Sequence, residues 1–122
     1  MKQRDPRQHD RKHLDFIRSL PCCVCLNSVE TEAAHVRMSD AMSAKINPGV
    51  GAKPHDRWTV PLCSQHHREQ HADGDERAFW HWHCINPLWL ALVLHSVTGN
   101  HYAARRAIEA HHINANDPFW RR

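Results

Sequence analysis

The sequence has no apolar segment long enough to cross a membrane. A spanning helix needs about 20 consecutive apolar residues, whereas the longest apolar run, residues 88–94, ends at His95. The first five residues, MKQRD, are not followed by the apolar stretch of a secretory signal. These absences argue against a membrane protein or a secreted one, and we expect a cytoplasmic location.

Apolar content and net charge are both modest. Hydrophobic residues make up 41% of the 122 residues, and so small a domain often needs a metal or a disulfide to support its core. The chain has 13 histidines and five cysteines, and in a reducing compartment cysteines are more often metal ligands than disulfides. The formal net charge of +3 is compatible with nucleic-acid binding but does not establish it. We therefore expect one metal-stabilised domain.

Periodicity and turn residues predict short helices around one pair of strands. Apolar residues at three-residue spacing favour a helix before Pro21. Two strand candidates flank a loop over 38–55 that contains two prolines and two glycines. Ser64 is expected to cap the next helix, and Pro87 to begin a later one. In chain order, the expected elements are a helix over 10–20, strands over 31–37 and 57–62, and helices over 64–71, 75–84, 87–97 and 101–112.

These elements describe a small α+β protein with one domain over residues 1–122 and a helical extension over 75–112. The segments 1–9 and 113–122 are expected to be flexible tails. Several apolar side chains of the extension are spaced to cover the hairpin or to pack one helix on another. These residues are Trp80, Trp82, Leu88, Trp89, Leu92 and Val93.

Two pairs of residues have the spacing of a structural zinc site. Cys22-x2-Cys25 and Cys63-x2-His66 can each bind one ion from a tight turn, and together they fill a tetrahedral shell. A closed shell has no open position, so the zinc would join the first helix to the hairpin and stabilise the fold. A Cys23-x-Cys25 pair is conceivable, but a single intervening residue binds less well. Buried free thiols beside a surface histidine are the alternative.

A second cation site is predicted on the helix over 64–71. His67 and His71 are four residues apart, so they share one helix face and can chelate one cation. His66 is rotated by about 100° from His67, so that it can face the zinc while His67 faces a different metal. A solvated, histidine-rich helix face is the alternative.

His35, in the first strand, is a candidate general base. The second strand leads into the helix with the histidine pair, and a hairpin packed on that helix would bring the His35 imidazole near the metal. Neutral imidazole suits the activation of water near neutral pH; a structural histidine is the alternative. Arg37, on the same strand face, is a candidate phosphate clamp. Lys53 and Arg68 are further candidates, and ordinary solvated charge is the alternative for all three.

A histidine-bearing strand, a long loop, a second strand and a helix with His-x3-His together resemble the HNH endonucleases, which have a ββα-metal (His-Me finger) core. The strings LPCCVC, AAHVR, KPHDRWTVPLCSQHHREQH and INPLWLALVLHSVTG are similar to prophage-encoded HNH proteins related to the phage recombination-enhancement nuclease. The resemblance runs from about His13 to Gly99. It implies a metal-dependent DNA endonuclease of phage or prophage origin, acting in the cytoplasm of a bacterium or a phage-infected host.

The resemblance implies a role for each site residue. His35 corresponds to the general base, and His67 and His71 correspond to the ligands of one catalytic divalent metal, which would be Mg²⁺, Mn²⁺, Ni²⁺ or Zn²⁺. Asp56 corresponds to the central Asn or Asp that orders the hairpin loop, although it could instead contact the metal. The implied ligands of the structural zinc are Cys22, Cys25, Cys63 and His66.

Two positions depart from the HNH pattern. Many HNH proteins carry Asp or His as a metal ligand at the position of Ala34, so here Asp56, His55 or water must complete the shell. The central residue is Asp56 rather than Asn. No helix carries polar residues suited to base edges, so binding to DNA is expected to be electrostatic, salt-sensitive and weakly sequence-specific.

Two other functions remain open from the sequence. One is a catalytically inactive, zinc-stapled module that binds nucleic acid. The other is a phage regulatory protein whose helical tail binds a protein partner. A zinc peptidase is disfavoured because the chain has no His-Glu-x-x-His string.

Overall fold

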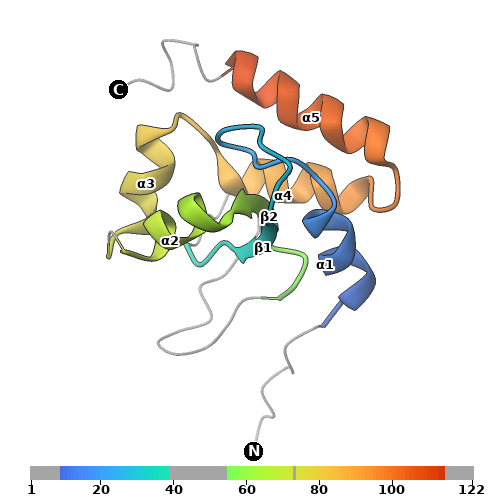
Figure 1. The fold of residues 1–122 in the computed structure, drawn as a ribbon, viewed down its shortest axis with the longest axis horizontal. Helices are drawn as coiled ribbons and strands as arrows, with labels where there is room; N and C mark the ends of the chain where they lie inside the picture. The colour runs from blue at the N-terminus through green and yellow to red at the C-terminus, as the bar shows by residue number, and fades with distance from the viewer. Residues whose placement is uncertain (1–8, 39–54, 73, 115–122) are drawn as a thin grey trace, which may run out of the picture.

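The chain folds into a short β-hairpin surrounded by helices (Figure 1). The computed structural model describes residues 9–38, 55–72 and 74–114. The α+β class is confirmed, and each predicted element is present, with ends that differ by no more than two residues. The elements of the described residues are α1 (Arg11–Arg18), β1 (Thr31–His35), β2 (Thr59–Cys63), α2 (Ser64–Ala72), α3 (Glu76–Trp82), α4 (Pro87–Ser96) and α5 (His101–Asn114).

Parts of the prediction lie outside the described residues. They are 1–8 and 115–122 of the predicted tails and 39–54 of the predicted loop, which includes Lys53. The C-terminal tail was placed too early, because α5 continues to Asn114.

The junction between β2 and α2 carries four of the candidate site residues, namely Cys63, His66, His67 and His71. β1 pairs with β2 in an antiparallel register that sets His35 opposite Thr59. All five residues of β2 are buried, and α2 follows β2 directly. Pro61 of β2 has no N–H, and its carbonyl accepts the N–H of Cys23 at 2.9 Å. The loop after α1 is therefore attached to the hairpin beside α2.

Polar side chains cap the N-termini of four helices, and Asn100 caps α5 by accepting the N–H of Ala103 at 3.0 Å. Asn86 accepts the N–H of Trp89, and Pro87 occupies the first turn of α4, as predicted. Asp10 and Asp75 cap α1 and α3 in the same way. The prediction for Ser64 was wrong: Ser64 is the first residue of α2, and its hydroxyl donates to Glu30 Oε2 at 3.3 Å.

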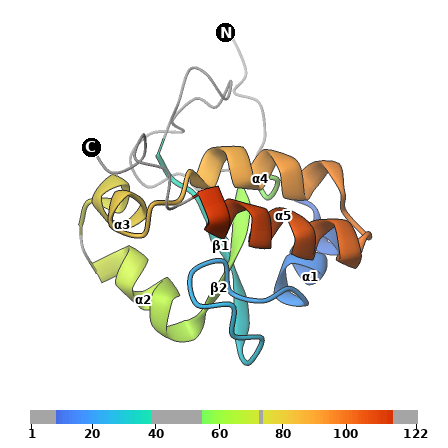
Figure 2. The same ribbon diagram turned by 90° about the horizontal axis from the view of Figure 1, so that it is seen from above.

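The helices cover the hairpin from several directions. α1 and α2 lie on opposite sides of it in both views (Figures 1 and 2). α4 packs against β2, and α5 packs on α4 (Figure 2). Apolar side chains from α1, both strands and α4 form one buried core. In the described ranges, no helix combines the length and the apolar character that a membrane span requires.

Part of the predicted apolar stripe is not in the core. Trp80 and Leu88 are buried, whereas Trp82, Trp89 and Leu92 are 82%, 45% and 38% exposed. The sequence of α4 is apolar around its whole circumference, so periodicity could not show which face would be buried.

Candidate metal centres and active site

Four potential ligands converge where the loop after α1 meets the β2–α2 junction. The Sγ atoms of Cys22, Cys25 and Cys63 and a ring nitrogen of His66 all lie within 4.8 Å of one another. Cys22 and Cys25 come from the loop, Cys63 ends β2, and His66 lies in the first turn of α2. This cluster could hold a structural metal ion such as zinc. Among the described residues, it is the only such group with three or more potential ligands.

The distances within the cluster fit a tetrahedral zinc ion. Zn–S bonds of about 2.3 Å and Zn–N bonds of about 2.0 Å require ligand separations of about 3.5–3.8 Å at the tetrahedral angle. Cys25 Sγ and Cys63 Sγ are 3.9 Å apart, and Cys22 Sγ lies 3.8 Å from His66 Nδ1. Cys63 Sγ and His66 Nδ1 are closer, at 3.1 Å. Only a small opening of this last pair is needed to fit the ion.

The protein environment affects how readily the Cys22 thiol loses its proton. Burial raises the pKa of Cys22 to about 11, although backbone N–H groups of neighbouring residues act against this. The thiol therefore releases its proton to solvent readily only when a cation binds its sulfur. Cys23 is 1% exposed and lies outside the cluster. The Cys22-x2-Cys25 pairing is thus the one that the loop geometry supports.

A carboxylate stands behind the histidine of this cluster. His66 directs Nδ1 toward Cys63, and its Nε2 lies 3.6 Å from Glu69 Oε2, one turn further along α2. The His66 ring also meets the edge of the His83 ring, with centroids 5.6 Å apart. His66 therefore has neighbours on both sides that restrict its orientation.

His67 and His71 form a second, separate pair on α2. Their Nε2 atoms are 3.3 Å apart. Two imidazoles bound to one cation at about 2.1 Å place their nitrogens about 3.0–3.4 Å apart, depending on the bond angle. The pair therefore fits one divalent cation. His67 Nδ1 also lies 2.6 Å from Glu32 Oε1 of β1, a contact that the sequence analysis missed.

His71 lies between two surface hollows, and its surroundings favour the neutral ring. One hollow, of about 430 Å³, is lined by His67, Arg68, His71 and Ala72. The other, of about 240 Å³, is lined by Arg37, Gln70, His71, Gly74 and Glu76. Burial lowers the pKa of His71, and the charges of His67 and Arg37 lower it further, against the opposite effect of Glu76. A neutral imidazole is the form that binds a metal.

The partly buried His35 pairs with the buried Asp56 next to the start of α1. His35 Nε2 lies 2.9 Å from Asp56 Oδ1, and Asp56 Oδ2 accepts the N–H of Asp10 at 2.8 Å. Asp56 is 1% exposed. One carboxylate oxygen of Asp56 therefore contacts the His35 ring of β1, and the other accepts the backbone N–H of Asp10, which caps α1. This arrangement favours a positioning role for Asp56 over coordination of the metal.

Gln70 connects the two halves of the candidate active site. Its amide donates to the His35 carbonyl at 3.3 Å and to Glu76 Oε2 at 2.9 Å, and Glu76 Oε1 accepts the N–H of Arg37. The backbone of β1 is therefore fixed against α2 at His35. His35 is not one of the described residues that line the two hollows beside His71.

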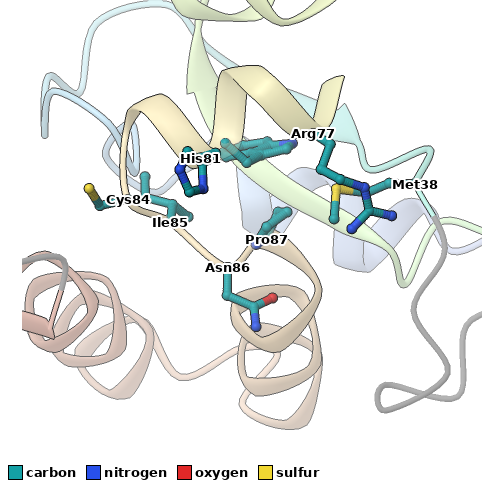
Figure 3. A pocket seen from close by; sticks show the side chains of 8 residues that line it. Met38, Arg77, His81, Cys84, Ile85, Asn86 and Pro87 are labelled. Atoms are coloured by element: carbon teal, nitrogen blue, oxygen red, sulfur yellow. The ribbon is translucent and has the colours of Figure 1, made fainter. Parts of the chain in front are cut away.

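A third hollow, of about 280 Å³, lies where α3 meets α4 (Figure 3). It is next to the second hollow in sequence at two places. Arg37 and Glu76 line the second hollow, and the residues that follow them, Met38 and Arg77, line the third. Its lining residues are Met38, Arg77, Trp80, His81, Cys84, Ile85, Asn86 and Pro87. Each of the three hollows therefore carries one arginine, and none of the described residues that line the third is acidic.

Comparison with known proteins identifies the family. Residues 2–97 match the family model described as a protein of unknown function, DUF968. The chain belongs to the DUF968 family. The DUF968 match contains both histidine and cysteine clusters and ends after α4, so that α5 lies beyond it. No curated protein and no solved structure matches the chain significantly.

Proposed function

We propose that this DUF968 protein is a metal-dependent endonuclease of the HNH, or ββα-metal, class that hydrolyses DNA phosphodiester bonds with weak sequence specificity. The main support is the unit of β1, β2 and α2, on which His67 and His71 have the spacing of a cation site. The resemblance of the sequence to phage and prophage HNH proteins agrees with this unit. A cytoplasmic enzyme of bacterial or phage origin is part of the proposal.

His35 acts as the general base in this proposal. Because a carboxylate only accepts hydrogen bonds, His35 donates its Nε2–H to Asp56. Nδ1 then has the lone pair that removes a proton from the attacking water. Asp56 holds the ring and stabilises the imidazolium that forms, and the buried contact with the Asp10 N–H keeps its carboxylate in place.

His67 and His71, whose Nε2 atoms are 3.3 Å apart, would hold the divalent cation. When bound, such a cation stabilises charge on the phosphate and on the departing 3′ oxygen. Ala34 provides no ligand, so water and phosphate oxygens would occupy the positions that these imidazoles leave open. We expect weaker cation binding than in sites with three protein ligands.

The arginines of the three hollows provide charge for the nucleic-acid backbone. Arg68 and Arg37 lie in the hollows on either side of His71, and Arg77 lies in the next one. If the cation held one phosphate of a DNA strand, these arginines would lie near the adjacent phosphates of the same DNA strand. Such contacts depend on charge and not on base identity.

Cleavage of supercoiled plasmid by zinc-loaded protein tests the proposal, with Mg²⁺, Mn²⁺ or Ni²⁺ added in separate reactions. We expect cleavage by the wild type and its loss in His35→Ala and His67→Ala. His101→Ala is a matched control, because His101 bonds Ser19 on the α1–α5 side. Circular dichroism and zinc content check that each variant is folded. Wild-type protein that cuts with none of the cations, or His35→Ala that cuts as well as the wild type, contradicts the proposal.

The alternative is a zinc-stapled module that binds nucleic acid without cleaving it, or a phage regulatory protein. One observation favours it: in the part of the chain that the structure describes, the cysteine cluster alone offers three or more protein ligands. DNA binding by the wild type without cleavage, under every cation, would support the binding module. A protein partner retained after nuclease treatment would support the regulatory protein.

A further inference from the structure

We propose that Glu32 is a positioning residue that prepares His67 to bind a cation, by fixing its neutral ring with the proton on Nδ1 and the lone pair on Nε2. Only the use of this cation in DNA cleavage rests on the proposed function. The contact itself, and its effect on cation binding, do not require cleavage.

The geometry of the contact determines the position of the proton. Glu32 Oε1 lies 2.6 Å from His67 Nδ1, the distance of a short, charge-assisted hydrogen bond. An ionised carboxylate has no proton to donate, so Nδ1–H of His67 is the donor. A neutral imidazole carries one N–H, and Nε2 therefore has a lone pair. This nitrogen is the one that lies 3.3 Å from His71 Nε2.

His71 completes the site by a shift of one proton. Without a cation, His71 donates its Nε2–H to the lone pair of His67 Nε2, as their separation allows. To bind a cation, His71 moves this proton from Nε2 to Nδ1 through solvent. Both Nε2 lone pairs then point to one place, and neither ring changes its charge. Glu32 ensures that only one of the two histidines has to rearrange.

The position of Glu32 on β1 explains its role. Side chains of a strand alternate between its faces, so Glu32 shares a face with Ala34, where HNH proteins often place a metal ligand. Glu32 meets His67 at Nδ1, on the side of the ring away from His71. It therefore supports the ligand and does not bind the cation itself. Metal-binding histidines commonly donate their second N–H to a carboxylate in this way.

A looser contact with a carboxylate occurs at the neighbouring histidine. His66 faces the cysteine cluster through Nδ1 and has Glu69 on the side of Nε2, at 3.6 Å. His66 and His67 are adjacent in α2, and each has a carboxylate near the ring nitrogen that does not face its own metal site. Glu32 makes the closer contact of the two.

The experiment combines histidine NMR with a titration of Ni²⁺ into zinc-loaded protein. We expect the ¹⁵N shifts of wild-type His67 to report a protonated Nδ1 before Ni²⁺ is added. In Glu32→Ala, the proton should move largely to Nε2, and Ni²⁺ affinity should fall by about 10- to 100-fold. Glu32→Gln should recover part of the affinity, because its amide oxygen can still accept the Nδ1–H.

Two variants provide the controls. Glu30→Ala also removes one carboxylate near α2, but Glu30 bonds Ser64 and not a histidine, so Ni²⁺ affinity should not change. His67→Ala measures the background from the other histidines. Zinc content and circular dichroism should be the same in all variants.

A wild-type His67 that is protonated on Nε2 overturns the proposal, and this result needs no variant. Glu32→Ala with wild-type Ni²⁺ affinity overturns it as well. A protein that binds Ni²⁺ in a Glu32-dependent way but does not cut DNA would contradict the proposed function while supporting this inference.

Discussion

Acidification should destabilise the fold through His111. This residue of α5 is 4% exposed, and its Nε2 accepts the N–H of Asn86, which caps α4. The accepting nitrogen must be unprotonated. Burial, and after it the charge of His112, lowers the pKa of His111 from 6.5 to about 4. The contact between α5 and the start of α4 therefore requires a neutral ring.

The size of the effect follows from the two pKa values. Between pH 6.5 and pH 4 the unfolded chain binds the additional proton more readily, so stability falls as the pH falls. The stabilisation is fully present above pH 6.5 and is lost progressively toward pH 4. At about 1.4 kcal/mol for each pKa unit, the total approaches roughly 3 kcal/mol, of which about 2 kcal/mol is lost by pH 5.

Urea unfolding in excess zinc at pH 7.5 and pH 5.0 measures this loss. His111→Gln is the matched variant, because its amide oxygen can accept the Asn86 N–H but does not titrate in this range. We expect the wild type to lose about 2 kcal/mol more than the variant between the two pH values. Zinc ligands and other histidines contribute equally to both proteins. An equal loss in both would refute the reasoning.

Three further predictions concern the zinc cluster, the core and the arginines. Cys63→Ser should lose the bound zinc and much of its helical circular dichroism signal. The control variant Cys84→Ser should keep both. Zinc retained by Cys63→Ser would contradict the proposed zinc cluster. Leu94→Ala should lower the free energy of unfolding by about 2–5 kcal/mol in a urea titration, because Leu94 is 0% exposed; a change below the lower value would contradict its place in the core. Arg37→Ala should weaken DNA binding measured without added divalent cations and reduce the salt dependence by about one released ion. Arg106→Ala, on the exposed face of α5, should change neither.

The sequence predicted those features that depend on local spacing. The two-residue separation in each half of the cysteine cluster, the i and i+4 histidines of α2 and the Asn86–Pro87 start of α4 are properties of short segments. Each has a local geometry that is nearly independent of the rest of the fold.

The features that the sequence could not predict depend on packing between distant segments. Glu32 reaches His67 only because α2 lies across β1 in one orientation. Asp56 meets His35 across the long loop, and the sequence left its role open. The exposure of Trp89 depends on which side of α4 meets β2, and residues 87–94 of this helix are all apolar. These contacts require the tertiary arrangement.

The central claim is that adjacent histidines of α2 belong to two separate metal sites. Anomalous diffraction from crystals loaded with Zn²⁺ and then with Ni²⁺ tests it most directly. We predict zinc bound by three thiolates and the Nδ1 of His66, and nickel between the Nε2 atoms of His67 and His71. Nickel elsewhere, with none between His67 and His71, would contradict the second site and with it the proposed active site.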